Sequence, residues 1–69
     1  MKEIVKNNLG EEIKYYRQQA MMSQKQLAKE IGTTQPSVSR WEKNEVEPSL
    51  IFCIALANCF GITLDELLN

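Results

Sequence analysis

The sequence predicts an all-α domain built from five short helices, and three observations support this prediction. With 69 residues, the chain is long enough for one small domain and too short for two. Its 2 prolines and 3 glycines are too few for a loop-dominated chain, and 43% hydrophobic with 25% charged residues is typical of a globular domain. Apolar residues also recur at helical spacing between recognisable helix starts and stops. We expect residues 1–7 to form an N-terminal segment and residues 8–69 the domain.

The first helix is expected to run from Asn8 to about Gln19. Asn8, followed three residues later by Glu11, resembles a capping box, in which the two side chains bind free backbone N–H groups of the first turn. The positions expected on its inner stripe have the spacing of one helix face: Leu9, Ile13, Tyr16 and Ala20.

A second, shorter helix is expected between Ser23 and Gly32. Ser23 with Gln26 forms a capping-box pattern, and Gly32 suits a left-handed stop. This leaves a helix of about eight residues. Its inner face is expected to hold Leu27, Ala28 and Ile31.

A third helix follows after a tight turn. Thr34 is its expected cap, and Pro36 lies in the first turn, where a missing N–H costs nothing. The helix is expected to run to about Lys43, with Asn44 as a left-handed stop.

Two more helices complete the predicted domain. Pro48-Ser49 opens the fourth, which Gly61 ends. Thr63 and Glu66 form a capping-box pattern for a last turn or two that ends in Leu67 and Leu68.

Composition excludes several classes of function. The longest apolar run, Leu50 to Ala57, is far shorter than the roughly 20 residues that span a bilayer, and residues 1–6 hold no apolar signal region, so we expect a cytoplasmic protein. Cys53 and Cys59 lie six positions apart in a helical pattern, roughly 9 Å along the axis, which is too far for a disulfide. Because the chain has no histidine and no third cysteine, we expect no zinc site. Most general-base and nucleophile sites need a histidine, so we expect no catalysis. We also expect no cofactor.

The charge is divided along the chain. All eight basic residues lie within the first 43 residues, which carry a net charge of +3, whereas residues 44–69 carry −4. The overall charge of −1 therefore hides a basic half that could face nucleic acid.

Two short helices joined by a tight turn containing glycine form the helix-turn-helix arrangement, which places its second helix in the major groove of DNA. The motif residues and the segments that follow them are Ser23-Gln24, Leu27-Ala28, Gly32, Val38-Ser39, Trp41-Glu42, Pro48-Ser49-Leu50, Ala57 and Leu64-Asp65-Glu66-Leu67-Leu68. With these residues, the chain resembles the phage repressor/Cro-like (XRE-type) helix-turn-helix family over residues 8–69. This resemblance implies a five-helix DNA-binding domain that regulates transcription, commonly as a repressor and as a dimer on a palindromic operator.

The two faces of the third helix follow from a rotation of about 100° per residue. Val38, Trp41 and Glu42 cluster on one side and are expected to face the core. The opposite side, together with the free N-terminus of the helix, is expected to face the groove. It holds Gln35, Pro36, Ser37, Ser39, Arg40 and Lys43, which match the family positions that contact bases or phosphates.

Base chemistry assigns roles to this face. Gln35 can pair with adenine through N6 and N7, and Arg40 with guanine through O6 and N7, each contributing about 1–3 kcal/mol of discrimination. Ser37 and Ser39 can donate to a base or a phosphate. The alternative for Gln35 and Arg40 is an ordinary solvated helix face.

Three further positions complete the expected interface. Lys43 is better placed for a phosphate than for a base. Pro36 offers only an apolar contact, such as one to a thymine methyl group. Gln24 lies in the first turn of the second helix, where free N–H groups and the helix dipole favour a phosphate; the alternative for Gln24 is plain surface.

The resemblance also implies a structural ion pair between Arg17 and Glu42, which would tie the first helix to the third. Met21 stands where relatives usually have a glycine, so either its backbone is strained or the turn closes differently. The core is expected to include Tyr16, Leu27, Ile31, Trp41, Leu56 and Phe60, which lie on inner stripes.

The fourth helix is apolar on all sides, although an outer helix should have a polar face. Its inner positions are expected to be Leu50, Cys53, Ile54, Leu56, Ala57 and Phe60. The remaining positions, Ile51, Phe52 and Ala55, suggest a homodimer interface that spaces two recognition helices about 34 Å apart. The alternative is that the N-terminal segment, with Ile4 and Val5, covers them within one chain.

The sequence thus predicts a sequence-specific regulator that binds double-stranded DNA with its third helix. The alternative is an antitoxin-like or scaffold module in which the acidic residues Glu45 and Glu47 and the apolar fourth helix bind an unidentified protein partner.

Overall fold

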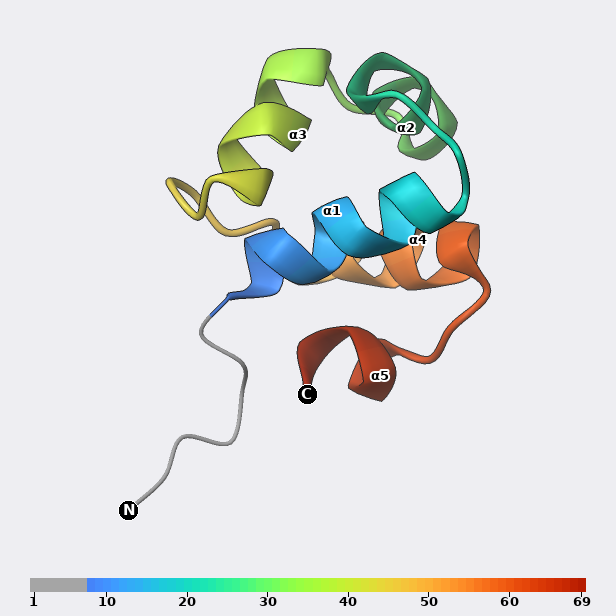
Figure 1. Ribbon diagram of the computed structural model, residues 1–69. Helices are drawn as coiled ribbons and strands as arrows, with labels where there is room; N and C mark the ends of the chain where they lie inside the picture. The colour runs from blue at the N-terminus through green and yellow to red at the C-terminus, as the bar shows by residue number, and fades with distance from the viewer. Residues whose placement is uncertain (1–7) are drawn as a thin grey trace.

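A computed structural model describes residues 8–69, which fold into five helices without a strand in that range (Figure 1). The predicted all-α, five-helix architecture is therefore confirmed. The N-terminal segment, with Ile4 and Val5, lies outside the described residues. The helices are α1 (Leu9–Gln19), α2 (Gln24–Ile31), α3 (Gln35–Glu42), α4 (Leu50–Phe60) and α5 (Leu64–Leu68).

Helices α2 and α3 lie side by side at one end of the domain, and α5 lies at the opposite end (Figure 1). Between them, α1 and α4 pack against each other, and α1 also contacts α3. The outer side of α3 is therefore turned away from the rest of the domain, while its inner side rests on α1 and α2.

Each of the five helices contributes one fully buried side chain to a single core: Ile13, Leu27, Val38, Leu56 and Leu67. Burying a side chain of this size contributes about 1.5–3 kcal/mol. Among the other residues expected in the core, Trp41 is also buried. Tyr16, Ile31 and Phe60 are half-buried and pack against the edge of this core.

Four helix starts and two helix stops follow the predicted local chemistry. Ser23 and Thr63 form complete capping boxes, and Thr34 and Ser49 each accept a backbone N–H bond at the starts of α3 and α4. Gly32 and Gly61 end α2 and α4 in the left-handed region. These caps fix where α3 begins, and thus which residues lie at its exposed N-terminus.

The start of α1 differs from the prediction. Asn8 makes no side-chain cap bond, because its backbone (φ −117°, ψ 51°) is not extended as at the other caps. Its Nδ2 instead donates to Glu11 Oε1 over 2.9 Å. Ala20, expected on the inner stripe, is exposed because it lies just past the end of α1.

Candidate nucleic-acid interface

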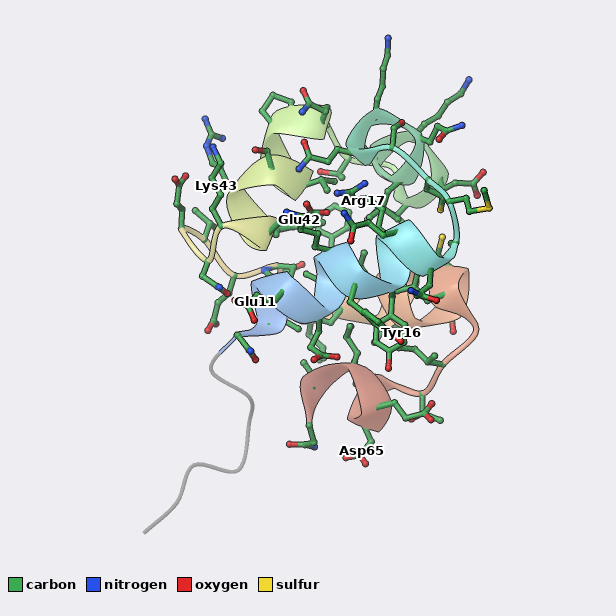
Figure 2. The ribbon with its side chains drawn as sticks, in the orientation of Figure 1. Glu11, Tyr16, Arg17, Glu42, Lys43 and Asp65 are labelled. Atoms are coloured by element: carbon green, nitrogen blue, oxygen red, sulfur yellow. The ribbon has the colours of Figure 1, made fainter. Side chains whose placement is uncertain are left out.

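Helix α3 has one face in the core and one face in solvent. Val38, Trp41 and Glu42 are buried. Gln35, Pro36, Arg40 and Lys43 are exposed, and Ser37 and Ser39 are half-buried between the two faces. Figure 2 shows Lys43 pointing away from the domain while Glu42, its neighbour in the chain, points inward. The six residues expected on the outer side and at the N-terminus of α3 are thus exposed or half-buried, and the three expected in the core are buried.

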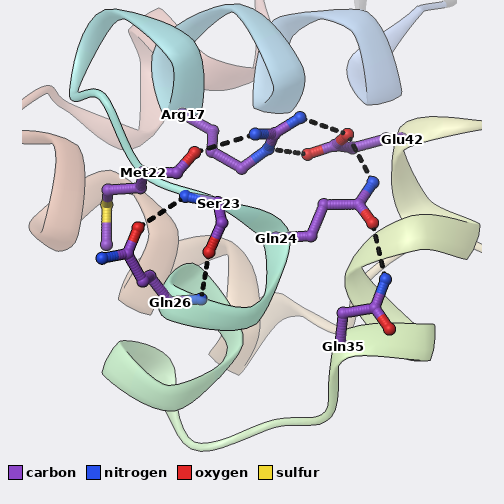
Figure 3. A network of polar contacts seen from close by, with 7 residues as sticks. All are labelled: Arg17, Met22, Ser23, Gln24, Gln26, Gln35 and Glu42. Atoms are coloured by element: carbon purple, nitrogen blue, oxygen red, sulfur yellow. Dashed lines mark hydrogen bonds and ion pairs between the residues drawn. The ribbon is translucent and has the colours of Figure 1, made fainter.

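The inner end of α3 is held by the two side chains for which an ion pair was expected. Arg17 on α1 donates from Nε to Glu42 Oε2 over 2.6 Å and from Nη2 to Glu42 Oε1 over 3.1 Å (Figure 3). Arg17 Nη1 also donates to the Met22 carbonyl over 2.8 Å. The two side chains are only 12% and 4% exposed, so this bidentate pair lies in a largely desolvated site.

Two glutamines continue this network from Glu42 to the surface. Gln24 Nε2 donates to Glu42 Oε1 over 2.9 Å, and Gln35 Nε2 donates to Gln24 Oε1 over 2.8 Å (Figure 3). The first residues of α2 and α3 are thereby joined to a buried carboxylate. Neither bond is predictable from the sequence, because the spacing along the chain gives no signal for contacts between residues that lie 11 or 18 positions apart.

Thr34, the cap of α3, is hydrogen-bonded to Ser37, one of the residues expected to contact DNA. Ser37 donates its backbone N–H to Thr34 Oγ1, and the two hydroxyl groups lie 2.9 Å apart. The Ser37 hydroxyl is thus positioned by the cap at the exposed end of α3.

Helix α4 presents an apolar face that differs from the one predicted. Ile51 is 76% exposed, as expected, but Leu50 and Ile54, which were assigned to the interior, are also exposed. Phe52 was expected to lack a core partner and instead lies half-buried with its ring centroid 5.3 Å from that of Trp41. The helix is rotated so that Cys53, Leu56 and Ala57 face inward. Ala55 is half-buried.

The pattern that defines the HTH_3 helix-turn-helix family matches residues 13–67, from the middle of α1 to the end of α5. The chain belongs to this family. As a helix-turn-helix transcriptional regulator it falls in a DNA-binding class without enzymatic activity, in agreement with the sequence analysis.

Known members resemble this regulator in sequence and in structure. It is 31% identical over 55 residues to the uncharacterized HTH-type transcriptional regulator MJ0272 of Methanocaldococcus jannaschii, covering 80% of this chain and 83% of that one. The P22 c2 repressor, solved in complex with a synthetic operator, superimposes with a TM-score of 0.86 at 30% identity, over 93% of this chain and 97% of the solved repressor chain. SinR in complex with DNA gives a TM-score of 0.80 at 27% identity, over 86% and 95% of the two chains. These matches confirm the predicted repressor-like fold.

Of the two cysteines of the regulator, Cys53 is buried and Cys59 is half-buried. Burial raises the pKa of the Cys53 and Cys59 thiols, and the nearby carboxylates of Glu47 and Glu30 raise them further, so both thiols stay protonated at neutral pH. Both cysteines are free. Across residues 8–69, His, Cys, Asp and Glu form no cluster suited to a metal ion, and no helix has both the length and the apolar character to cross a membrane.

Proposed function

We propose that this helix-turn-helix regulator binds a specific sequence in double-stranded DNA, with α3 in the major groove, and acts as a repressor in the cytoplasm. The observation that carries the proposal is the division of α3 into an anchored inner face and an exposed polar outer face. A recognition helix must keep its orientation while its outer side chains meet base edges. The P22 c2 repressor and SinR, whose DNA complexes superimpose on this chain, support the same role.

Two side chains on α3 would read bases directly. Gln35 offers an amide that pairs with adenine through N6 and N7, and Arg40 offers a guanidinium that pairs with guanine through O6 and N7. Both are exposed, Gln35 at the N-terminus of α3 and Arg40 in its last turn. Ser39 adds a hydroxyl between them, and Pro36 adds an apolar contact for a thymine methyl group.

Other side chains would position the protein on the phosphate backbone of the DNA. Lys43 points outward at the end of α3 and suits a phosphate (Figure 2). Gln24 keeps one Nε2 hydrogen and the free backbone N–H of the first turn of α2 for a second phosphate, and Ser37 can add a third contact. Glu45 and Glu47 are also exposed in the following loop, where they would repel a duplex that came close to that loop.

The exposed face of α4 would join two copies of the chain. Ile51 lies between the exposed residues Leu50 and Ile54, and Val46 in the preceding loop is exposed as well. Phe52 and Ala55 would form the rim of this interface. A two-fold contact of this kind repeats α3 on the partner, and a palindromic operator with half-sites about 34 Å apart matches that symmetry.

Selection of bound sequences from a random duplex pool tests the proposal. We expect wild-type protein to enrich a palindromic motif and the Gln35→Ala, Arg40→Ala double variant to lose it. Circular dichroism confirms that each protein is folded. Folded wild-type protein that enriches no sequence would contradict the proposal.

A second candidate function is favoured by one observation. The exposed apolar face of α4 follows two exposed glutamates in the chain, Glu45 and Glu47, and neither feature suits DNA. An antitoxin-like or scaffold domain would use this surface to bind a protein partner. This candidate predicts a monomer in isolation that forms a stoichiometric complex through α4.

A further inference from the structure

The chain of side-chain contacts that ends at Gln35 begins at a buried carboxylate. Glu42 Oε1 accepts from Gln24 Nε2 over 2.9 Å, and Gln24 Oε1 accepts from Gln35 Nε2 over 2.8 Å (Figure 3). The Glu42 side chain is only 4% exposed and is paired with Arg17. A fixed internal charge is therefore connected through two amides to the residue that faces the groove.

Glu42 sets the direction of each hydrogen bond in this series of side chains. An ionised carboxylate accepts hydrogen bonds and cannot donate them, so Gln24 must turn its NH₂ group toward Glu42. The carbonyl oxygen of Gln24 then faces Gln35, and Gln35 must donate in turn. Rotating either amide by 180° would bring two oxygens or two NH₂ groups together, so the rotated arrangement is disfavoured.

Once the orientation of the Gln35 amide is fixed, the side chain offers a base one hydrogen-bond acceptor and one donor in defined positions. One Nε2 hydrogen is used by Gln24, so Gln35 presents Oε1 as an acceptor and its other Nε2 hydrogen as a donor. Adenine offers the complementary pair in the major groove, a donor at N6 and an acceptor at N7. Guanine offers acceptors at both O6 and N7, so its O6 would oppose Gln35 Oε1.

We propose that Glu42, which is buried and faces away from the groove, is a positioning residue. It makes Gln35 select adenine over guanine at the base pair that Gln35 contacts, which is called the Gln35 step below. The inference rests on the proposed role of α3 as the DNA-reading helix. It assigns to Glu42 a function in base discrimination that is separate from its ion pair with Arg17.

The Glu42→Gln variant tests this inference. An amide at position 42 can donate as well as accept, so the direction of the contacts is no longer fixed and Gln35 can turn its NH₂ group toward guanine. Affinities are measured for the selected duplex and for the same duplex with A·T changed to G·C at the step that Gln35→Ala affects. We expect Glu42→Gln to lower the preference for adenine about tenfold at that step and to leave the Arg40 step unchanged.

Two further variants separate base discrimination from folding. Arg17→Lys weakens the bidentate pair but leaves the carboxylate in place, so we expect lower stability with the adenine preference retained. Gln24→Leu interrupts the contacts without removing the ion pair, so we expect the same loss of preference as in Glu42→Gln. If Glu42→Gln does not fold, the same affinities measured with Gln24→Leu test the inference.

The outcomes are distinct. Wild-type preference for adenine in Glu42→Gln or in Gln24→Leu would overturn the inference, and so would an equal loss of preference in Arg17→Lys. If Gln35→Ala alters no base step, or if wild-type protein selects no sequence, the proposed function fails and this inference fails with it.

Discussion

The backbone N–H of Gly10 donates a 2.9 Å hydrogen bond to Oδ1 of Asn44, which joins the first turn of α1 to the loop that follows α3. The first N–H groups of a helix have no partner within it, and Asn44 supplies one from 34 positions along the chain. Asn44 itself has a φ of 61°, a left-handed conformation that asparagine tolerates. The end of α3 is thereby held on α1 by this hydrogen bond as well as by the Arg17–Glu42 pair.

Gly10→Ala is expected to destabilise the domain by about 1–3 kcal/mol. A Cβ at this position would lie 2.3 Å from the Trp41 carbonyl oxygen and 2.7 Å from that of Glu42, so the backbones of α1 and α3 would have to separate. Urea unfolding measures the change. Lys14→Ala, at an exposed position of α1, is the control and should change stability by less than about 0.5 kcal/mol. Equal effects of the two substitutions would contradict the close approach.

Arg17→Ala is expected to cost about 3–5 kcal/mol, because it leaves the carboxylate of Glu42 buried without its partner. The substitution also removes the bond to the Met22 carbonyl. Thermal unfolding measures the loss, and Arg40→Ala, which removes an exposed arginine from α3, provides the matched control. A melting curve for Arg17→Ala that coincides with wild type would show that the pair does not stabilise the domain.

Met21→Gly is expected to stabilise the protein by about 0.5–1 kcal/mol. Met21 has a φ of 57° and is 90% exposed, so it bears the steric cost of the left-handed region without packing against the core. Glycine removes that cost but loses more entropy on folding, which limits the gain. Met21→Ala keeps the Cβ and should show no comparable gain. If alanine stabilises as much as glycine, backbone strain at Met21 is not the cause.

The features predicted well from the sequence are those set by neighbouring residues. Ser23, Thr34 and Thr63 cap helices because their hydroxyls reach N–H groups only three residues away. Asn8 fails as a cap because its own φ and ψ, which residue type does not determine, turn its side chain toward Glu11.

The candidate site was predicted less completely, because its geometry depends on contacts between helices. Rotation about the α3 axis was enough to place Arg40 and Lys43 outside and Trp41 inside. Nothing in the spacing indicates that Gln24 bonds to Glu42, since this needs α2 and α3 at a particular distance. The face of α4 was misjudged for a related reason: a helix that is apolar on all sides gives no polar stripe to show which side is outside, and Phe52 found a partner in Trp41.

Ile51→Lys is expected to weaken self-association at least tenfold, because a charge in an apolar two-fold contact is desolvated and faces its own copy. Phe52 is left unchanged, since it packs against Trp41 and its replacement would also perturb the fold. Sedimentation equilibrium measures the dissociation constant. Met21→Lys removes an even more exposed apolar side chain from the turn between α1 and α2 and should not affect association. A dimer of unchanged stability in Ile51→Lys would place the interface elsewhere.

The central claim, that the outer face of α3 recognises a DNA sequence, is tested most directly by the ratio of affinities for the selected duplex and a scrambled one. Wild-type protein should prefer the selected duplex by at least about 10³-fold. The Gln35→Ala, Arg40→Ala double variant should lose most of that ratio, while Lys29→Ala, which removes one exposed positive charge from α2, should weaken both complexes alike. A folded double variant that keeps the wild-type ratio would show that α3 does not read the sequence.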